Sequence, residues 1–210
     1  MKLSSHHRIP NVETFLEYCK LRQYPKKSII LGPDDPNDAL LYIIEGSVAI
    51  TIRHNKQQEM IVTYLNEGSF IGEGGFFDPE AKRTSYVRAK TDCIVGMITY
   101  ERLHEVLQEH PEFLKPMVHQ LVRRLKEVTR KAGDLFFMDV TGRVSHTLLE
   151  LTKQPEAETH PDGMQIKVTR QEISNIVGCS REMVGRVLRA LEDRGMVESH
   201  GKTLVVYAAR

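Results

Sequence analysis

The residues with the clearest chemical pattern lie in the segment 169–188, where charged and apolar side chains recur at helical spacing. Arg181, Glu182 and Arg186 share the polar side of this segment. Arginine can donate two hydrogen bonds to the paired acceptors of guanine, and glutamate can accept one from the amino group of cytosine. These residue types therefore predict contacts to the base edges of DNA, with an ordinary solvated helix face as the alternative.

Two short helices around a glycine turn are predicted to position these side chains. Thr169 and Glu172 have the Thr-x-x-Glu spacing of a capping box, which satisfies backbone donors at the start of a helix. Gly178 suits the left-handed conformation that commonly ends a helix, and Ser180 is a favourable N-cap for the next one. This order predicts a helix-turn-helix.

The net charge of the chain is only +1, but its local distribution is uneven. Between Lys167 and Arg189 there are five basic and two acidic residues, a net charge of +3 where a phosphate backbone would lie. The chain has 210 residues, 40% hydrophobic and 27% charged, which is ordinary for one large or two small globular domains. With no apolar run near the roughly 18 residues of a membrane span and no signal-peptide core, we expect a cytoplasmic protein without a membrane partner.

Residues that would support catalysis or metal binding are missing from the sequence pattern. Cys19, Cys93 and Cys179 are far apart and form no Cys-x-x-Cys pair, so they are expected to be buried free thiols. The nine histidines show no compact ligand spacing, and no nucleophile elbow or P-loop is found. We therefore expect neither a metal site nor an enzyme.

The N-terminal half, from about Val12 to Thr99, contains short β-type runs separated by turn residues. These runs are Leu40–Ile44, Ser47–Ile52, Glu59–Tyr64, Ser85–Ala89 and Cys93–Ile98. Their regular spacing predicts an antiparallel sandwich or jelly roll.

Residues 100–137 are predicted to be helical, with an interruption at Pro111. After the proline, apolar residues follow alternating steps of four and three, which is a heptad seam. The seam residues are Leu114, Val118, Leu121, Leu125, Val128, Ala132 and Leu135. We expect a parallel homodimer along this helix; the alternative is an amphipathic helix packed on its own sheet. The flanking basic residues, expected to be solvated, are Arg123, Arg124, Lys126, Arg130 and Lys131.

The C-terminal part is predicted to be a winged helix-turn-helix. A helix over 140–153 and a loop over 154–163 precede the two helices, and a hairpin follows. In that hairpin, 196–197 and 203–207 flank His200 and Gly201, and Lys202 at the tip is placed to contact a phosphate. The chain is thus expected to be an α+β protein with a β-roll domain (1–110), a dimerisation helix and hinge (111–138) and a DNA-binding domain (139–210).

Several motifs, taken with this order of elements, carry a resemblance to a known family. They are Phe70–Glu73, Arg83–Thr84, Asp139–Arg143, His160–Gln165, Val177–Glu182 and Gly201–Thr203. The chain resembles the bacterial CRP/FNR family of transcription regulators, over nearly its whole length after the first ten residues. The resemblance is most specific in the C-terminal third.

The resemblance implies a cyclic AMP pocket in the β-roll. Gly72 would let the backbone approach the phosphate, Arg83 would bind that phosphate as a bidentate fork, and Thr84 would add a hydroxyl. Glu73 would accept a hydrogen bond from the ribose 2′-hydroxyl. Gly74 departs from the family, which has a larger apolar residue there. From the residues alone, a buried Arg–Glu ion pair is the alternative.

A second departure is the pair Val128 and Thr129, where the family commonly has a hydroxyl that meets the adenine amino group, with a second hydroxyl next to it. One neutral hydrogen bond contributes about 1 kcal/mol, so cyclic AMP binding is expected to survive its loss. Val128 is also a seam position, and an apolar residue there favours a closed seam without ligand. We therefore expect weaker ligand dependence than in the family, or a different nucleotide.

The DNA and polymerase contacts of the family also map onto this sequence. Base contacts from Arg181, Glu182 and Arg186 imply a TGTGA-type half-site in a palindrome. The positions implied for DNA backbone contacts are Thr169, Arg170, Gln171, Ser180, His200 and Lys202. Those implied for RNA polymerase contacts are Thr159, His160, Gly163, Lys20, Arg22 and Arg102. A third polymerase surface, acidic in the family, is basic here over 53–56.

Two other functions remain open. One is a regulator of the same fold that acts without a ligand or responds to cyclic di-GMP. The other is a cyclic-nucleotide enzyme such as a phosphodiesterase, which would need a metal or general-base cluster that the sequence does not show.

Overall fold

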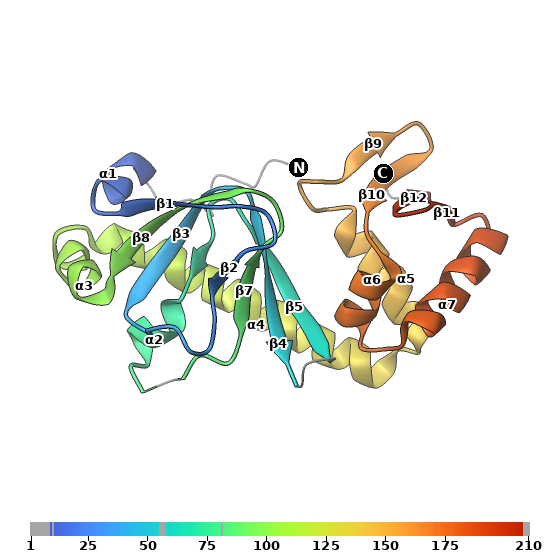
Figure 1. Cartoon of the computed structure of the whole chain (residues 1–210), viewed down its shortest axis with the longest axis horizontal. Coiled ribbons are helices and arrows are strands. Elements are labelled where there is room, and N and C mark those ends of the chain that lie inside the picture. Colours follow the sequence, from blue (N-terminus) through green and yellow to red (C-terminus); the bar gives the residue numbers. More distant parts are fainter. Residues whose placement is uncertain (1–8, 10, 55–57, 81, 208–210) are drawn as a thin grey trace. The chain divides into compact units, whose positions relative to one another are not determined.

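A computed structural model describes residues 9, 11–54, 58–80 and 82–207. Its contacts divide the chain into two compact units (Figure 1). The N-terminal unit contains the described residues up to 54 and from 61 to 128; the C-terminal unit contains 58–60 and 129–207.

In the described part of the N-terminal half, eight strands form two four-stranded sheets. The first has the order β1 (Lys20–Tyr24), β8 (Cys93–Thr99), β3 (Ala39–Glu45) and β6 (Phe70–Ile71). The second has the order β2 (Ile29–Leu31), β7 (Tyr86–Ala89), β4 (Ser47–Arg53) and β5 (Glu59–Asn66). β3 runs antiparallel to β8 and β6, and β4 runs antiparallel to β7, as expected for a sandwich.

The first sheet lies between two apolar clusters, because successive side chains of a strand point to opposite faces. In β3, Leu41 and Ile43 join the cluster between the two sheets, whereas Leu40 and Tyr42 join the cluster covered by helices. The helices that begin in this unit are α1 (Val12–Glu17), α2 (Glu73–Phe77), α3 (Tyr100–Glu109), the 3-10 turn η2 (Pro111–Phe113) and α4 (Leu114–Phe137). The predicted break at Pro111 is confirmed.

The predicted β zone was incomplete in three places and wrong at its start. α1 occupies 12–17, which is too short for a helical pattern to be visible. β1 was not predicted because four of its five residues are exposed, so it lacks apolar alternation. β2 has three residues and β6 has two, and such short strands carry no periodic signal.

The C-terminal unit packs three helices against one four-stranded sheet. The helices are α5 (Val140–Leu151), α6 (Arg170–Val177) and α7 (Arg181–Asp193), and the sheet order is β11 (Val197–His200), β12 (Thr203–Tyr207), β10 (Gly163–Lys167) and β9 (Glu158–His160). Leu148, Ile173, Val184 and Leu188 are buried between these elements. This is a winged helix-turn-helix.

The segment predicted as a loop over 154–163 contains β9 and the first residue of β10, so that prediction was wrong. Gly163 pairs with Tyr207 of β12, and a side chain at 163 would collide with the carbonyl of Val206. α5 ends at Leu151, two residues before the predicted end. Among the described residues, no helix is long and apolar enough to cross a membrane.

Candidate functional site

A cavity of about 340 Å³ opens in the N-terminal unit. Its walls come from β4, β5, β7, the segment from β6 into α2, and α4. The predicted pocket residues that line it are Gly72, Glu73, Gly74, Arg83, Thr84 and Val128. The volume falls within the usual range for a small-molecule site.

The turn at Gly72 requires glycine for two reasons. Its φ of 89° lies in the left-handed region, and a Cβ there would approach the carbonyl oxygen of Ala39 to 2.8 Å. The same Cβ would lie 3.5 Å from Nη1 of Arg83. A bare backbone at residue 72 therefore keeps the space beside the Arg83 guanidinium open. Gly74 faces open space, since no heavy atom lies within 4 Å of a Cβ built there.

Glu73 forms an ion pair with Arg124 of α4, and Arg124 also donates to the carbonyl oxygen of Phe70. Their side chains are only 13% and 21% exposed. The prediction that Arg124 is a solvated flank was therefore wrong. The Arg–Glu pair expected as the alternative does exist, but it joins Glu73 to Arg124 rather than to Arg83.

Two polar atoms of the cavity are buried without a hydrogen-bond partner. They are Oε2 of Glu73 and Nε of Arg83. Arg83 otherwise donates from Nη2 to the carbonyl oxygen of Pro36 at 3.3 Å. An unpartnered guanidinium donor suits an anion such as a phosphate, and an unpartnered carboxylate oxygen suits a hydroxyl. The residues present thus fit a sugar phosphate, and a cyclic nucleotide supplies both groups.

α4 presents two different faces, which explains how a pocket residue can also be a seam residue. Met117, Gln120 and Arg124 follow steps of three and four and face the β-roll, where Gln120 accepts from the Phe70 amide at 3.0 Å. The seam residues Leu125 and Val128 are 67% and 50% exposed in the single chain. Val128 also lines the cavity, whereas Thr129 is exposed and outside its lining.

The remaining seam residues also leave apolar surface uncovered. Leu114, Val118, Ala132 and Leu135 are exposed, and Leu121 is half-buried. The alternative of a helix packed only on its own sheet accounts for the face of Gln120 and Arg124 but not for this seam.

The end of α4 and α5 are joined by a charged cluster that sequence reasoning missed. Arg130 donates to Asp134 at 2.7 Å, and the ring of His146 lies 3.0 Å from the same carboxylate. Arg130 was expected to be a solvated flank, so this prediction was wrong. The sequence signal that could have predicted this cluster is an aspartate, Asp134, near the end of one helix and a histidine, His146, on the next helix.

The thiols are free, but only Cys93 is fully buried as predicted. Cys19 and Cys179 are partly exposed, although burial still raises the pKa of Cys19 to about 12. In the described part of the chain, no group of three or more histidine, cysteine, aspartate or glutamate side chains is arranged to hold a metal ion.

The local geometry of the helix-turn-helix follows the predicted caps. Thr169 Oγ1 accepts from the amide of Glu172 at 3.1 Å, and Ser180 Oγ accepts from the amide of Met183 at 3.2 Å. Gly178 has a φ of 73°, the left-handed conformation expected at the turn. Ser174 is buried and donates to the carbonyl oxygen of Gln171 at 2.8 Å, so a polar side chain is satisfied inside the motif.

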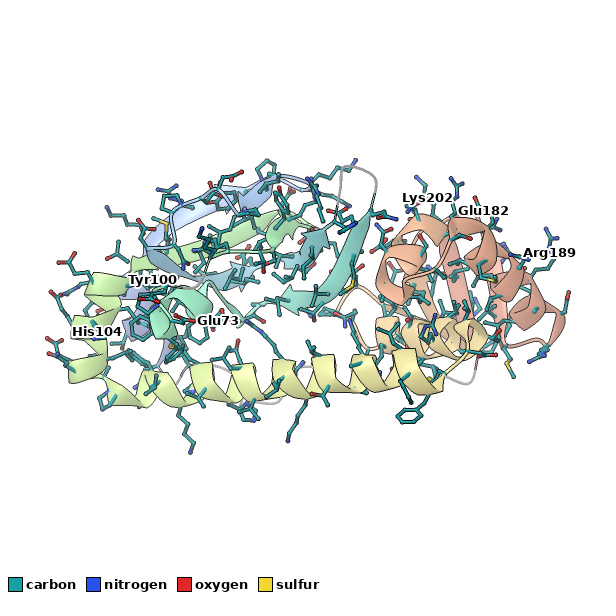
Figure 2. The ribbon with its side chains drawn as sticks, turned by 90° about the horizontal axis from the view of Figure 1, so that it is seen from below. Glu73, Tyr100, His104, Glu182, Arg189 and Lys202 are labelled. Carbon is teal, nitrogen blue, oxygen red and sulfur yellow. The ribbon has the colours of Figure 1, made fainter. Side chains whose placement is uncertain are left out.

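The polar side of α7 forms a groove of about 360 Å³. It is lined by Arg170, Arg181, Glu182, Gly185, Arg186 and Arg189. Hydrogen bonds from its own amide and from Ser180 keep the pKa of Glu182 below its usual value, so the side chain is a charged acceptor. Glu182 and Lys202 project on the same side of this unit (Figure 2). Gln171 and Lys202 are exposed, and Nε2 of His200 lies 2.9 Å from a carboxylate oxygen of Glu198.

The residues predicted to contact RNA polymerase differ in accessibility. Lys20 and Arg22 are exposed on β1, and Arg102 is exposed on α3, where it pairs with Glu105. Thr159 is exposed and His160 is half-buried on β9. Gly163 is buried in β10, and as a glycine it offers only its backbone. Of the basic stretch 53–56, residues 55 and 56 lie outside the described residues.

Two family models match the chain in order. The cyclic nucleotide-binding domain matches residues 21–110, and the Crp-like helix-turn-helix domain matches residues 142–208. The cAMP-activated global transcriptional regulator CRP of Salmonella typhimurium is 49% identical over 210 residues, which is 100% of each chain. The chain belongs to the CRP/FNR family of transcriptional regulators.

Other members of the family resemble the chain to a similar degree. The cAMP-activated global transcriptional regulator Vfr of Pseudomonas aeruginosa is 50% identical over 206 residues, covering 97% of this chain and 96% of Vfr. The c-di-GMP responsive global regulator CLP of Xanthomonas campestris has a solved structure with a TM-score of 0.87 and 41% identity, covering 94% of this chain and 98% of CLP. This family member is therefore a DNA-binding transcription regulator with a cyclic nucleotide-binding domain, and not an enzyme.

Proposed function

We propose that the protein is a homodimeric, cytoplasmic transcription regulator that binds cyclic AMP in the β-roll cavity. In this proposal α7 recognises a palindromic TGTGA-type operator, and the bound dimer recruits RNA polymerase or blocks promoters. The division into 1–110, 111–138 and 139–210 is part of the proposal. The unpartnered atoms of Arg83 and Glu73 in one cavity carry it most directly.

The roles of the cavity residues follow from their positions. Arg83, Thr84 and the bare backbone at Gly72 would hold the phosphate, and Glu73, kept in place by Arg124, would accept from the ribose hydroxyl. Val128 would meet the base without a hydrogen bond, and Thr129 is proposed to lie next to the nucleotide only once a partner chain is present. The cyclic nucleotide would supply a phosphate acceptor for Arg83 and a ribose hydroxyl donor for Glu73.

The DNA and subunit contacts rest on exposed surfaces. Arg181, Glu182 and Arg186 line one groove and are proposed to read base edges. The proposed backbone contacts are Thr169, Arg170, Gln171, Ser180, His200 and Lys202. The exposed seam of α4 is proposed to close against a second copy. The proposed polymerase contacts are Thr159, His160, Gly163, Lys20, Arg22 and Arg102.

A second candidate is a regulator of this fold that is active without ligand or responds to another nucleotide such as cyclic di-GMP. Val128 favours this second candidate for two reasons. In the cavity, an apolar side chain offers no hydrogen bond to a base. On the seam, it adds apolar surface that can pack without a ligand. The 41% identity to the c-di-GMP responsive regulator CLP also supports it.

Calorimetric titration with cyclic AMP, cyclic GMP and cyclic di-GMP separates these candidates. We expect cyclic AMP to bind the wild type and Arg83→Gln to weaken it by about 10- to 100-fold, since a hydrogen bond to a charged group contributes roughly 1.5–3 kcal/mol. Arg88→Gln is the matched control, because Arg88 lies on β7 outside the cavity lining. Binding of cyclic di-GMP alone, or equal affinities for Arg83→Gln and wild type, would contradict the proposed pocket.

A further inference from the structure

Tyr100, the first residue of α3, contacts several of the groups that build the cavity without lining it. Its hydroxyl donates to the carbonyl oxygen of Gly72 and lies 3.2 Å from Oδ1 of Asn37. Burial raises the pKa of the Tyr100 phenol, and the nearby positive charge of Arg83 opposes that rise. One hydroxyl therefore connects the turn at residue 72 with the segment before β3.

Backbone hydrogen bonds and ring packing hold the Tyr100 side chain in place. The Tyr100 amide donates to the carbonyl oxygen of Asp38 at 2.8 Å, and Thr99 caps the helix that Tyr100 begins. The ring packs edge-on against Phe76 of α2 at 5.8 Å between centroids. Figure 2 shows Tyr100 and Glu73 in the same part of the N-terminal unit. A rigidly mounted hydroxyl can define the position of its partners.

The segment that precedes β3 completes this arrangement. The side chain of Asn37 lies against Gly75, where any Cβ would collide with it. Arg83 donates to the carbonyl oxygen of the neighbouring Pro36 at 3.3 Å. The contact to Pro36 thus orients Arg83 from outside the cavity and leaves its buried Nε unused.

The hydrogen bond to Gly72 has a consequence for the next peptide unit. In a trans peptide the C=O of one residue and the N–H of the next point in opposite directions. No peptide bond among the described residues is cis. Because the Gly72 carbonyl is directed at Tyr100, which is outside the cavity lining, the amide of Glu73 is turned the opposite way. The orientation of that backbone donor is therefore set by the phenol.

We propose that Tyr100 is a positioning residue for the phosphate of the bound nucleotide. Its hydroxyl orients the Glu73 amide through the Gly72 carbonyl, beside the Arg83 guanidinium and without touching the ligand. The inference rests on the proposed cyclic nucleotide site. It adds a stereochemical property to that site. Because the donors have fixed directions, the site distinguishes the two exocyclic oxygens of the phosphate.

Tyr100→Phe tests the role, because it keeps the ring against Phe76 and removes only the hydroxyl. The probes are cyclic AMP and its two exocyclic phosphorothioate diastereomers, in which sulfur replaces one or the other oxygen. We expect the wild type to prefer one diastereomer, and Tyr100→Phe to weaken cyclic AMP binding about 3- to 10-fold while bringing the diastereomer ratio towards one. A purely structural role would weaken both diastereomers equally and leave the ratio unchanged.

Tyr18→Phe is the matched control, since its hydroxyl lies 3.4 Å from His110 and outside the cavity lining. It is expected to leave affinity and ratio unchanged. Asn37→Ala is the second variant should Tyr100→Phe fold poorly, and it should move the ratio in the same direction. A wild-type ratio of one, or an unchanged ratio in a variant that binds less tightly, contradicts the inference. Absence of cyclic AMP binding to the wild type instead contradicts the proposed function.

Discussion

Arg83, Glu73 and Arg124 show how one pocket can hold three charged side chains without neutralising all of them. The Glu73–Arg124 pair uses one carboxylate oxygen, and the second oxygen and Nε of Arg83 are buried with no partner. Buried polar atoms without partners are costly and uncommon in native proteins. A ligand that satisfies both atoms would remove this cost on binding.

Glu182 gives the sharpest residue-scale prediction for DNA recognition. Glu182→Ala removes a charged acceptor from the groove of α7 and should relax preference at one base pair of each half-site by roughly 1–3 kcal/mol. Competition binding with half-sites varied at every position measures this profile. Glu192→Ala, on the same helix outside the groove, is the control. A base profile identical to the wild type would show that Glu182 reads no base.

The sequence indicated residues that the structure brings together around one cavity and along α7, but not Arg124 and Tyr100, which contact them. Gly72, Glu73, Arg83 and Thr84 line the cavity, as their motifs predicted. Arg124 was missed because a basic residue beside a seam resembles a solvated flank. Only the spacing of Met117, Gln120 and Arg124, at steps of three and four, indicates that α4 has a second face, packed on the β-roll. Tyr100 was missed because a hydrogen bond across 28 residues leaves no local pattern.

At the scale of elements, α4 packs one face on its own β-roll, and we propose that its seam packs on a second chain. The sheet-facing stripe is buried or paired, and the seam leaves large apolar side chains exposed. Helix boundaries at Pro111, Thr169, Gly178 and Ser180 were predictable because caps and breakers act locally. β1 and β9 were not, since their pairing depends on β8 and β10 rather than on their own residues.

The seam predicts a specific change in oligomeric state. Leu125→Glu would bring two carboxylates together in a parallel pair and remove apolar contact of about 2–3 kcal/mol per side chain, so the dimer should dissociate at micromolar concentration. Analytical ultracentrifugation measures this, and Lys126→Glu, exposed and off the seam, should remain dimeric. If Leu125→Glu sediments like the wild type, the subunits do not meet along this seam.

At the scale of the whole molecule, we propose that a nucleotide in the β-roll changes DNA recognition by the winged domain. Val128 belongs to both the cavity lining and the exposed seam, so in this proposal it is the residue where ligand and subunit contacts meet. A ligand can shift a conformational equilibrium only by its difference in affinity for the two states. An apolar Val128 strengthens the seam without ligand, which leaves a smaller shift for the nucleotide to produce.

Fluorescence anisotropy of a labelled TGTGA…TCACA palindrome, at fixed salt, with and without cyclic AMP and against a scrambled duplex, tests this claim most directly. We expect the free protein to prefer the palindrome already and cyclic AMP to tighten binding further, by less than about 100-fold. A free protein with no preference for the palindrome that cyclic AMP activates by more than about 100-fold would contradict the role given to Val128. Equal binding to both duplexes, unchanged by cyclic AMP, would contradict the account as a whole.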